Sequence, residues 1–124
     1  MPVIHAAQNL DLAAIASELG RVVAAARAGK LTQQDVRGGT FTLSNHGVSG
    51  SLLAAPIVIN QPQVAILGVG TVEKVPVVID DAIAIRSQCF LALTFDHRLI
   101  DGALGDQFTG KVKSVLESWS EEVL

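Results

Sequence analysis

Residues 91–102 read LALTFDHRLIDG and decide the fold, because a strand pattern ends and a helix pattern begins within them. Leu91, Leu93 and Phe95 recur at every second position, which is the period of a strand with one apolar face. A helical pattern starts at about Asp101. The sequence therefore predicts that His97 lies at the rim of a sheet, from where its side chain can reach a ligand.

The strand pattern continues upstream and predicts one long strand over residues 82–96. Its apolar face comprises Ile83, Ile85, Cys89, Leu91, Leu93 and Phe95. Its other face comprises Arg86, Gln88, Phe90, Ala92, Thr94 and Asp96. A turn is expected at Asp80 and Asp81, directly before this strand. A thiol on an apolar face usually behaves as a small buried hydrophobe, so Cys89 is expected in the core.

Helical spacing of apolar residues occurs near both ends of the chain. The first apolar face comprises Leu12, Ile15, Ala16, Leu19, Val22, Val23 and Ala26. The second comprises Leu104, Phe108, Val112, Val115, Leu116 and Trp119. For the first helix, Asn9 is the expected N-cap, Asp11 lies in the first turn, and Gly29 is the stop signal. Residues 32–35, TQQD, resemble a capping box that opens a short helical turn.

Shorter strands are expected at residues 40–44, 57–59, 63–70 and 71–79, which are rich in β-branched side chains. The stretch 57–59 is at best an edge strand, because prolines flank it. Together these elements predict an α/β (α+β) fold with a mixed, largely antiparallel sheet, backed by an N-terminal and a C-terminal helix. The chain has 124 residues without repeat or linker, which predicts a single domain.

The composition favours a folded domain that is partly covered by partners. Hydrophobic residues make up 49% and charged residues 17%, against about 25% charged in typical soluble domains. The net charge is −3 and no run of Lys or Arg occurs, so neither nucleic-acid nor membrane binding is expected. A single cysteine, the short apolar runs and the absence of a signal-peptide pattern indicate a soluble intracellular protein.

The sequence does not favour a nucleotide-binding site or a metal site. Gly68-Val69-Gly70 lacks the third glycine of a nucleotide-binding loop, and a strand follows it, so a β-bulge or tight strand contact is expected there. The three histidines and Cys89 lack the spacing of metal ligands, so no metal is expected. His46 is interpreted as a surface turn residue and His5 as a solvated residue near the terminus.

The residues around His97 allow two interpretations. An imidazole at a sheet rim can act as a general base near neutral pH. Alternatively, Asp101 simply caps the last helix, and Asp96 pairs with Arg98 or Arg86 on the polar face of the sheet. Spacing alone does not decide between these interpretations.

Several stretches of the sequence resemble those of a known protein family. The pattern H-x-x-x-D-G at His97, Asp101 and Gly102, preceded by residues 91–96, resembles the active-site strand of the dihydrolipoamide acyltransferases. These are the catalytic cores of 2-oxo acid dehydrogenase complexes and share the chloramphenicol acetyltransferase fold. Residues 38–45, GGTFTLSN, and residues 62–70, PQVAILGVG, resemble two further strands of the family, and Gly29-Lys30-Leu31 resembles the end of its helix.

The resemblance implies acyl transfer between a lipoyl-lysine arm and coenzyme A, both as substrates, without a metal. It implies that His97 is the general base, that Ser44 stabilises the tetrahedral oxyanion, and that Asp101 has a supporting role. Arg98 and Gly102 are implied to support the turn. Family members form trimers and larger hollow cores, in which Ser44 and His97 meet across a subunit boundary, and they bind lipoyl domains and other components of the complex.

The resemblance also implies that residues 1–124 are the C-terminal part of the catalytic domain, truncated relative to the family and without lipoyl and subunit-binding domains. Three alternatives remain: a working succinyl- or acetyl-type transferase, with a lean to the succinyl type from residues 47–53 and 99–102; a catalytically silent assembly module; and an unrelated ligand-binding domain. The expected compartment is the cytoplasm of a bacterium, or the mitochondrial matrix in a eukaryote.

Overall fold

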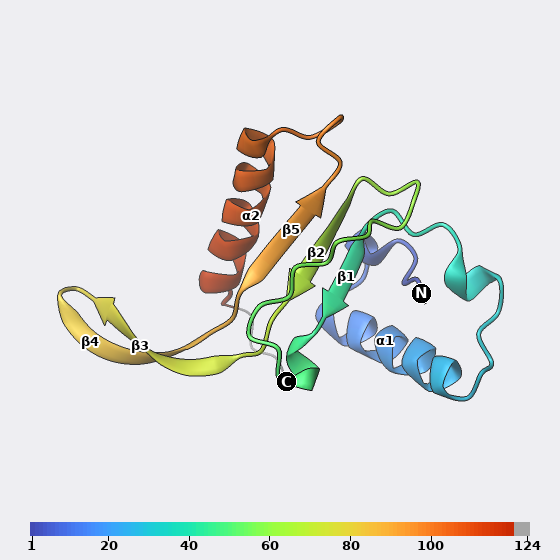
Figure 1. The fold of residues 1–124 in the computed structure, drawn as a ribbon. Coiled ribbons are helices and arrows are strands. Elements are labelled where there is room, and N and C mark those ends of the chain that lie inside the picture. The colour runs from blue at the N-terminus through green and yellow to red at the C-terminus, as the bar shows by residue number, and fades with distance from the viewer. Residues whose placement is uncertain (121–124) are drawn as a thin grey trace. The chain divides into compact units, whose positions relative to one another are not determined.

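The structure is a computed structural model that describes residues 1–120. It contains two compact units, residues 1–40 and residues 41–119 (Figure 1). Three short 3-10 helices carry the label η. The elements in chain order are η1 (Ala7–Asn9), α1 (Leu12–Arg27), η2 (Gln34–Val36), β1 (Thr42–Asn45), η3 (Gly47–Ser49), β2 (Ala65–Val69), β3 (Glu73–Ile79), β4 (Ala82–Gln88), β5 (Leu91–Phe95) and α2 (Gly102–Glu117).

The first unit is built on α1, and the predicted helix is confirmed. Its N-cap is Asp11, whose side chain accepts a hydrogen bond from the Ala14 backbone N–H at 2.7 Å. The prediction of Asn9 as N-cap was wrong, because Asn9 ends the separate helix η1. Gly29 follows the helix with a φ of 66°, a left-handed conformation that glycine adopts without steric cost, so the predicted stop is confirmed.

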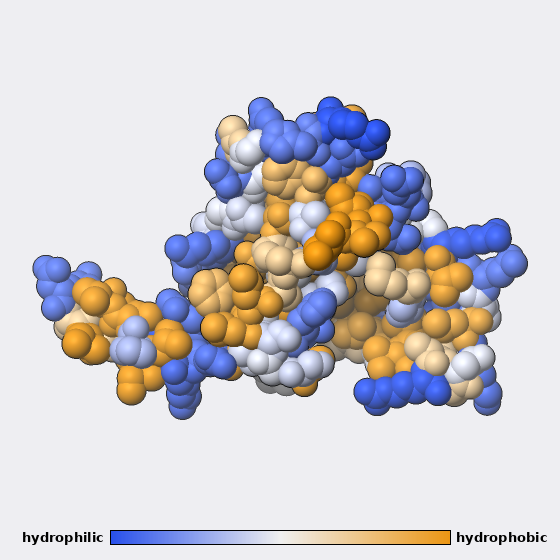
Figure 2. Space-filling model, in the orientation of Figure 1, coloured by the Kyte–Doolittle hydropathy of each residue, from blue (hydrophilic) through white to orange (hydrophobic). Residues whose placement is uncertain are grey.

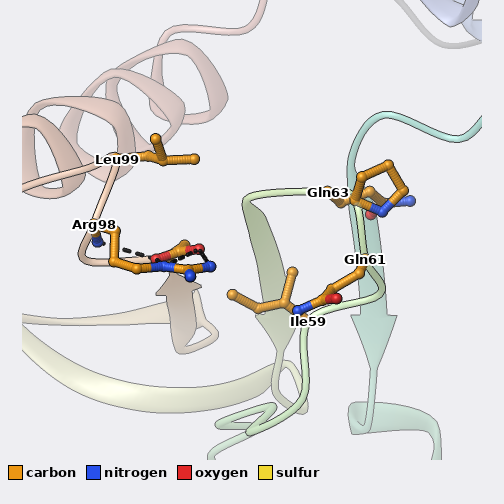
Figure 3. A pocket seen from close by; sticks show the side chains of 7 residues that line it. Ile59, Gln61, Gln63, Arg98 and Leu99 are labelled. Carbon is orange, nitrogen blue, oxygen red and sulfur yellow. Dashed lines mark hydrogen bonds and ion pairs between the residues drawn. The ribbon is translucent and has the colours of Figure 1, made fainter.

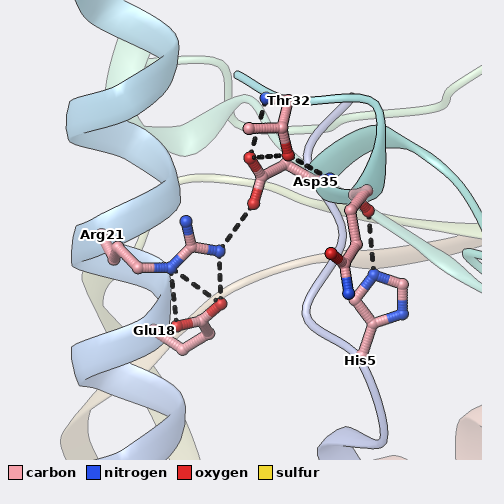
Figure 4. A network of polar contacts seen from close by, with 6 residues as sticks. His5, Glu18, Arg21, Thr32 and Asp35 are labelled. Atoms are coloured by element: carbon pink, nitrogen blue, oxygen red, sulfur yellow. Dashed lines mark hydrogen bonds and ion pairs between the residues drawn. The ribbon is translucent and has the colours of Figure 1, made fainter. Parts of the chain in front are cut away.

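The predicted capping box at residues 32–35 is also confirmed. Asp35 Oδ2 accepts from the Thr32 backbone N–H at 2.8 Å and from Thr32 Oγ1 at 2.7 Å, and the Asp35 N–H donates back to Oγ1 at 3.2 Å. Arg21 Nη2 reaches Asp35 Oδ1 at 2.8 Å and is also bonded to Glu18 (Figure 4). These bonds, first those from Thr32, hold the pKa of the Asp35 carboxyl far below its usual range. The same network therefore ties this turn to α1.

The second unit contains the mixed sheet that the sequence predicts. Three strands lie in the order β1-β2-β5, with β1 parallel to β2 and β2 antiparallel to β5. A separate antiparallel hairpin is formed by β3 and β4, joined at Asp80 and Asp81. Both aspartates have positive φ, 50° and 61°, which makes the tight turn. The prediction of a mixed, largely antiparallel arrangement with two helices is confirmed.

Helix α2 packs on β5 through a glycine. A Cβ added to Gly105 would lie 2.8 Å from Phe95 Cε1, so the ring of Phe95 lies directly against the helix backbone. The ring of Phe108, farther along α2, lies 5.6 Å from that of Phe41. Ala65, Ile66 and Leu67 of the central strand are buried. The core of this unit therefore lies around β2 and beneath α2.

The prediction of one long strand over residues 82–96 was wrong. This segment forms two strands, because β4 ends at Gln88 after pairing with β3, whereas β5 begins at Leu91 and pairs with β2. Cys89 lies in the connection and is exposed, so the prediction of a core position was wrong as well.

The predicted edge strand at residues 57–59 does not form. Ile57 is 90% exposed and Val58 80% exposed, and neither belongs to a strand. The strands predicted at residues 40–44, 63–70 and 71–79 form as β1, β2 and β3, with ends that differ from the prediction by at most two residues.

The glycines at 68 and 70 make the predicted tight contacts. A Cβ on Gly68 would collide with the backbone oxygen of Ala54, and a Cβ on Gly70 with that of Leu52. The loop that follows η3 therefore packs directly on the backbone of Gly68 and Gly70.

Apolar side chains lie at the surface of the β3–β4 hairpin, as Figure 2 shows. Val78 is 73% exposed, Ile83 82% and Ile85 68%. Neither helix in residues 1–120 is long and apolar enough to cross a bilayer.

Candidate active site

The turn between β5 and α2 is fixed by backbone hydrogen bonds. The Asp96 N–H donates to the Val64 oxygen at 2.8 Å, which extends the ladder between β5 and β2 by one bond. The Asp96 oxygen accepts from the N–H groups of Leu99 and Ile100, both at 3.0 Å. These bonds hold His97 at the rim of the sheet, where the sequence predicts it.

Asp96 and Arg98 form a two-pronged ion pair across this turn. Arg98 Nε lies 2.9 Å from Oδ1, and Nη2 lies 2.6 Å from Oδ2. The Arg98 backbone N–H also donates to Oδ1 at 3.0 Å. These hydrogen bonds lower the pKa of Asp96 to about 2 and raise that of Arg98. Of the two partners considered, Arg98 is confirmed, whereas Arg86 donates to the backbone oxygen of Ile85.

His97 is exposed and lies between the two residues of this pair in the sequence. Its ring centroid lies 5.4 Å from that of Phe95, with the planes inclined by 49°. Within residues 1–120 no hydrogen bond ties its ring nitrogens. The ring is thus held by contact with Phe95 and by the rigid turn, and either nitrogen can exchange a proton with a bound molecule.

Asp101 caps the last helix. Its Oδ1 accepts from the Leu104 backbone N–H at 2.8 Å, and its backbone is extended, as an N-cap requires. Gly102 begins the helix, and a Cβ there would meet nothing within 4 Å. The interpretation of Asp101 as a cap is confirmed, and its carboxylate stands four positions after His97.

A cavity of about 320 Å³ opens beside the ion pair (Figure 3). Arg98 and Leu99 lie on one side of it, and Ile59, Gln61 and Gln63 lie on the other. Its wall therefore combines an aliphatic surface with amide groups and one ion pair, next to the residue predicted as the base.

Ser44 lies in β1 and is half-buried. Its Oγ lies 2.9 Å from Nε2 of His46. His46 is exposed, as predicted for a surface turn residue, but sequence reasoning missed its contact with Ser44. The signal was present, because residues two apart in a strand point to the same face.

The register of the sheet separates Ser44 from His97 within one chain. Ser44 pairs with Gly68 of β2, and Gly68 pairs with Ala92 of β5. His97 lies 97 − 92 = 5 positions farther along the chain, beyond the far end of β5. Phe95 alone is about 10 Å past Ala92, and β1 and β5 are two strand spacings apart, so the backbones of Ser44 and Phe95 are roughly 14 Å apart. One chain does not bring the two predicted catalytic side chains together.

Comparison with known proteins assigns the family. Residues 1–124 match the family described as 2-oxoacid dehydrogenases acyltransferase (catalytic domain). The chain belongs to this acyltransferase family. It is 44% identical over 124 residues to the dihydrolipoyllysine-residue succinyltransferase component of the 2-oxoglutarate dehydrogenase complex of Bartonella vinsonii subsp. berkhoffii, covering 100% of this chain and 30% of that protein.

A second relative is named for a different acyl group. The dihydrolipoyllysine-residue acetyltransferase component of the pyruvate dehydrogenase complex of Mycobacterium bovis is 44% identical over 126 residues, with coverage of 98% of this chain and 23% of the relative. The chain thus spans less than a third of the length of these curated relatives.

Solved acyltransferase structures share the fold. A probable dihydrolipoamide acetyltransferase from Listeria monocytogenes superposes with a TM-score of 0.93 at 43% identity, over 99% of this chain and 52% of that one. The cubic core of a pyruvate dehydrogenase multienzyme complex gives 0.89 at 36% identity, over 94% and 48%. Azotobacter vinelandii dihydrolipoamide acetyltransferase gives 0.89 at 35% identity, over 94% and 48%; it was studied for the role of a serine, a histidine and an asparagine in catalysis.

No metal centre is evident in the described part of the chain. Among residues 1–120, His, Cys, Asp and Glu side chains do not gather in groups of three or more that could hold an ion.

Proposed function

We propose that this chain forms part of an acyltransferase core that moves an acyl group between coenzyme A and a dihydrolipoyl group. In this core Ser44 of one copy and His97 of another act on the same thioester. The observation that carries the proposal is the register of the sheet, which places the backbone of Ser44 roughly 14 Å from that of Phe95, two residues before His97, in one chain. A base and an oxyanion donor must both lie within about 3 Å of the reacting atoms, so a second copy has to supply one of them.

The spacing along the chain supports the choice of residues. In the Azotobacter vinelandii enzyme the asparagine follows the histidine by four positions, and the serine precedes the histidine by 52. Here Asp101 follows His97 by 101 − 97 = 4 positions, and Ser44 precedes it by 97 − 44 = 53. Asp101 thus takes the position of the asparagine, and its carboxylate oxygen is engaged as the cap of α2.

The chemistry needs one base and one oxyanion donor. His97 takes the proton from the dihydrolipoyl thiol, and the resulting thiolate attacks the carbonyl carbon of the acyl thioester. A new C–S bond forms, and the carbonyl oxygen becomes an oxyanion that the Ser44 hydroxyl stabilises. The intermediate collapses with cleavage of the bond to the coenzyme A sulfur, which takes the proton back from His97. Atoms and charge balance without a metal or redox partner.

Exposed apolar surface supports self-association. Ile57, Val58, Val78, Ile83 and Ile85 are each more than two-thirds exposed. Such side chains on the hairpin and in the loop before β2 gain by burial against a further copy. We propose trimers or larger cores as the assembly, with lipoyl domains and the other components of a 2-oxo acid dehydrogenase complex as partners.

The same exposed surface favours a second candidate function. A chain that associates through it but binds neither thiol substrate would serve only as an assembly module.

The test is an assay of acyl transfer to dihydrolipoamide from acetyl-, succinyl- and branched-chain acyl-coenzyme A. The parent should be active, and the preferred donor identifies the acyl class. His97→Ala should lower kcat by about 10²–10⁴-fold, while His5→Ala, the same change at a histidine of the other unit, should leave the rate unchanged. A folded, assembled parent with no rate above background would support the assembly module instead.

A further inference from the structure

The hydroxyl of Ser44 has a hydrogen-bond partner before any substrate arrives. Its Oγ lies 2.9 Å from Nε2 of His46. A hydroxyl has one proton to donate and lone pairs that accept. If the imidazole accepts, that proton points at the ring. If Nε2 carries a proton and donates, the hydroxyl proton remains free for another acceptor.

The backbone of His46 is fixed on both sides. Its N–H donates to the Val69 oxygen at 3.0 Å, which extends the ladder between β1 and β2. Its own oxygen accepts from the N–H groups of Ser49 at 3.0 Å and Ser51 at 3.4 Å. The imidazole is therefore attached to a rigid part of the sheet and stands on the same face as Ser44.

The chain turns directly after His46, and this turn is also fixed. The Gly47 N–H donates to Asn45 Oδ1 at 2.9 Å. A Cβ on Gly47 would collide with the backbone of Gly70, so only glycine fits where the two segments touch. The geometry that brings the imidazole to Ser44 thus depends on close backbone packing and does not rest on a flexible loop.

His46 is isolated from charge along the elements that hold it. Between Arg37 and Glu73 it is the only ionisable side chain in the sequence. Strands β1 and β2 and the η3 turn, to which it is bonded, therefore bring no carboxylate or cation to the imidazole. Its polar partner in the structure is the hydroxyl of Ser44.

We propose that His46 is a positioning residue that donates its Nε2 proton to Ser44 Oγ and so leaves the hydroxyl proton directed at the oxyanion. The inference rests on the proposed function, since it assigns to Ser44 the role of oxyanion donor. His46 does not touch the substrate and acts only through Ser44. The hydrogen bond from His46 therefore stabilises the transition state and not the bound substrate. Its removal lowers kcat with little change in KM.

Two substitutions separate this role from a structural one. His46→Leu removes the donor and should lower kcat by about 3- to 10-fold, the range that a single neutral hydrogen bond spans. His46→Gln carries an amide nitrogen the same number of bonds from the backbone and should restore kcat to within about 2-fold of the parent. His5→Leu, at the exposed histidine bonded to the Gln34 oxygen, is the matched control and should have no effect on kcat.

A double-mutant cycle tests whether His46 acts through Ser44. In a Ser44→Ala background, His46→Leu should cause no further loss of kcat, because the hydroxyl that it orients is gone. An equal loss in both backgrounds would overturn the inference, as would a His46→Gln variant as slow as His46→Leu.

A spectroscopic measurement does not depend on activity. In protein with ¹⁵N-labelled histidine, the ring chemical shifts report which nitrogen carries the proton, and the His46 signals are those absent from His46→Gln. Protonation at Nε2 is expected, and a neutral ring protonated only at Nδ1 would overturn the inference. The failure of each proposal is distinguishable: an inactive parent contradicts the proposed function, whereas an active parent that His46→Leu leaves unchanged contradicts this inference alone.

Discussion

Ser44 and His97 stand at opposite ends of the three-stranded sheet. Ser44 is level with Ala92, near the start of β5, whereas His97 follows the end of that strand. The antiparallel pairing of β2 with β5 produces this separation, because it directs the ends of β1 and β5 to opposite edges. Under the proposed function, a reaction that uses both side chains therefore needs two copies of the chain.

Asp101 should affect stability through its cap. Asp101→Ala removes the acceptor for the Leu104 N–H and should lower the free energy of unfolding by about 0.5–2 kcal/mol, whereas Asp101→Asn keeps an acceptor oxygen and should change it by a few tenths. Denaturant titration measures both. A loss with Asn as large as with Ala would show that charge, not the cap, is what this position provides.

Glycine at position 68 should be required by the loop that packs on β2. Gly68→Ala places a methyl group against the Ala54 oxygen and should destabilise the fold by about 1–3 kcal/mol or more. The matched control is Gly110→Ala in α2, where a Cβ meets nothing within 4 Å; it should stabilise by about 0.5–1 kcal/mol. Thermal unfolding compares the two, and similar shifts of the same sign would contradict the packing described here.

The ion pair at the site should be visible in a titration of Asp96. Its pKa is about 2 because Arg98 donates hydrogen bonds to both carboxylate oxygens. Arg98→Met should raise this pKa toward the ordinary value for an aspartate, near 3.9. The carboxyl carbon shift of Asp96, followed by NMR against pH, measures the change. An unchanged titration curve would exclude Arg98 as the cause.

The network around Asp35 should make stability depend on pH. Its pKa is lowered in the folded state, so the charged form favours folding. This contribution is complete above the unfolded pKa, near 3.9, and is lost as the pH falls below it toward the folded pKa. Unfolding midpoints measured between pH 6 and pH 2 should fall less steeply in Asp35→Asn than in the parent. Asp106→Asn, at an exposed position, is the control that should keep the parent's slope.

Elements whose sequence pattern is local were predictable, and those set by distant pairing were not. Both helices follow from their apolar spacing, and the turn at Thr32–Asp35 from its capping residues. The break between β4 and β5 could not be predicted, because Ile85, Cys89 and Leu91 keep the same alternation through it. Only the change of partner, from β3 to β2, separates the strands and exposes Cys89.

The candidate site shows the same division. His97, Arg98 and Asp101 lie within five residues, so their common turn was predictable from sequence. The distance between Ser44 and His97 depends on the order β1-β2-β5 and on register, which no local pattern encodes. The bond between Ser44 and His46 required only strand alternation, but a histidine beside glycines indicated a surface turn more strongly.

The most direct test of a shared site is complementation between two inactive chains. Ser44→Ala and His97→Ala chains are each expected to be inactive or nearly so; unfolded together and co-refolded at equal amounts, they should form mixed assemblies. If the site combines Ser44 of one copy with His97 of another, about a quarter of the randomly formed sites are intact, and about a quarter of the parent's acyl-transfer rate should return. If mixed assemblies form and no activity returns, a site that combines Ser44 of one copy with His97 of another is contradicted.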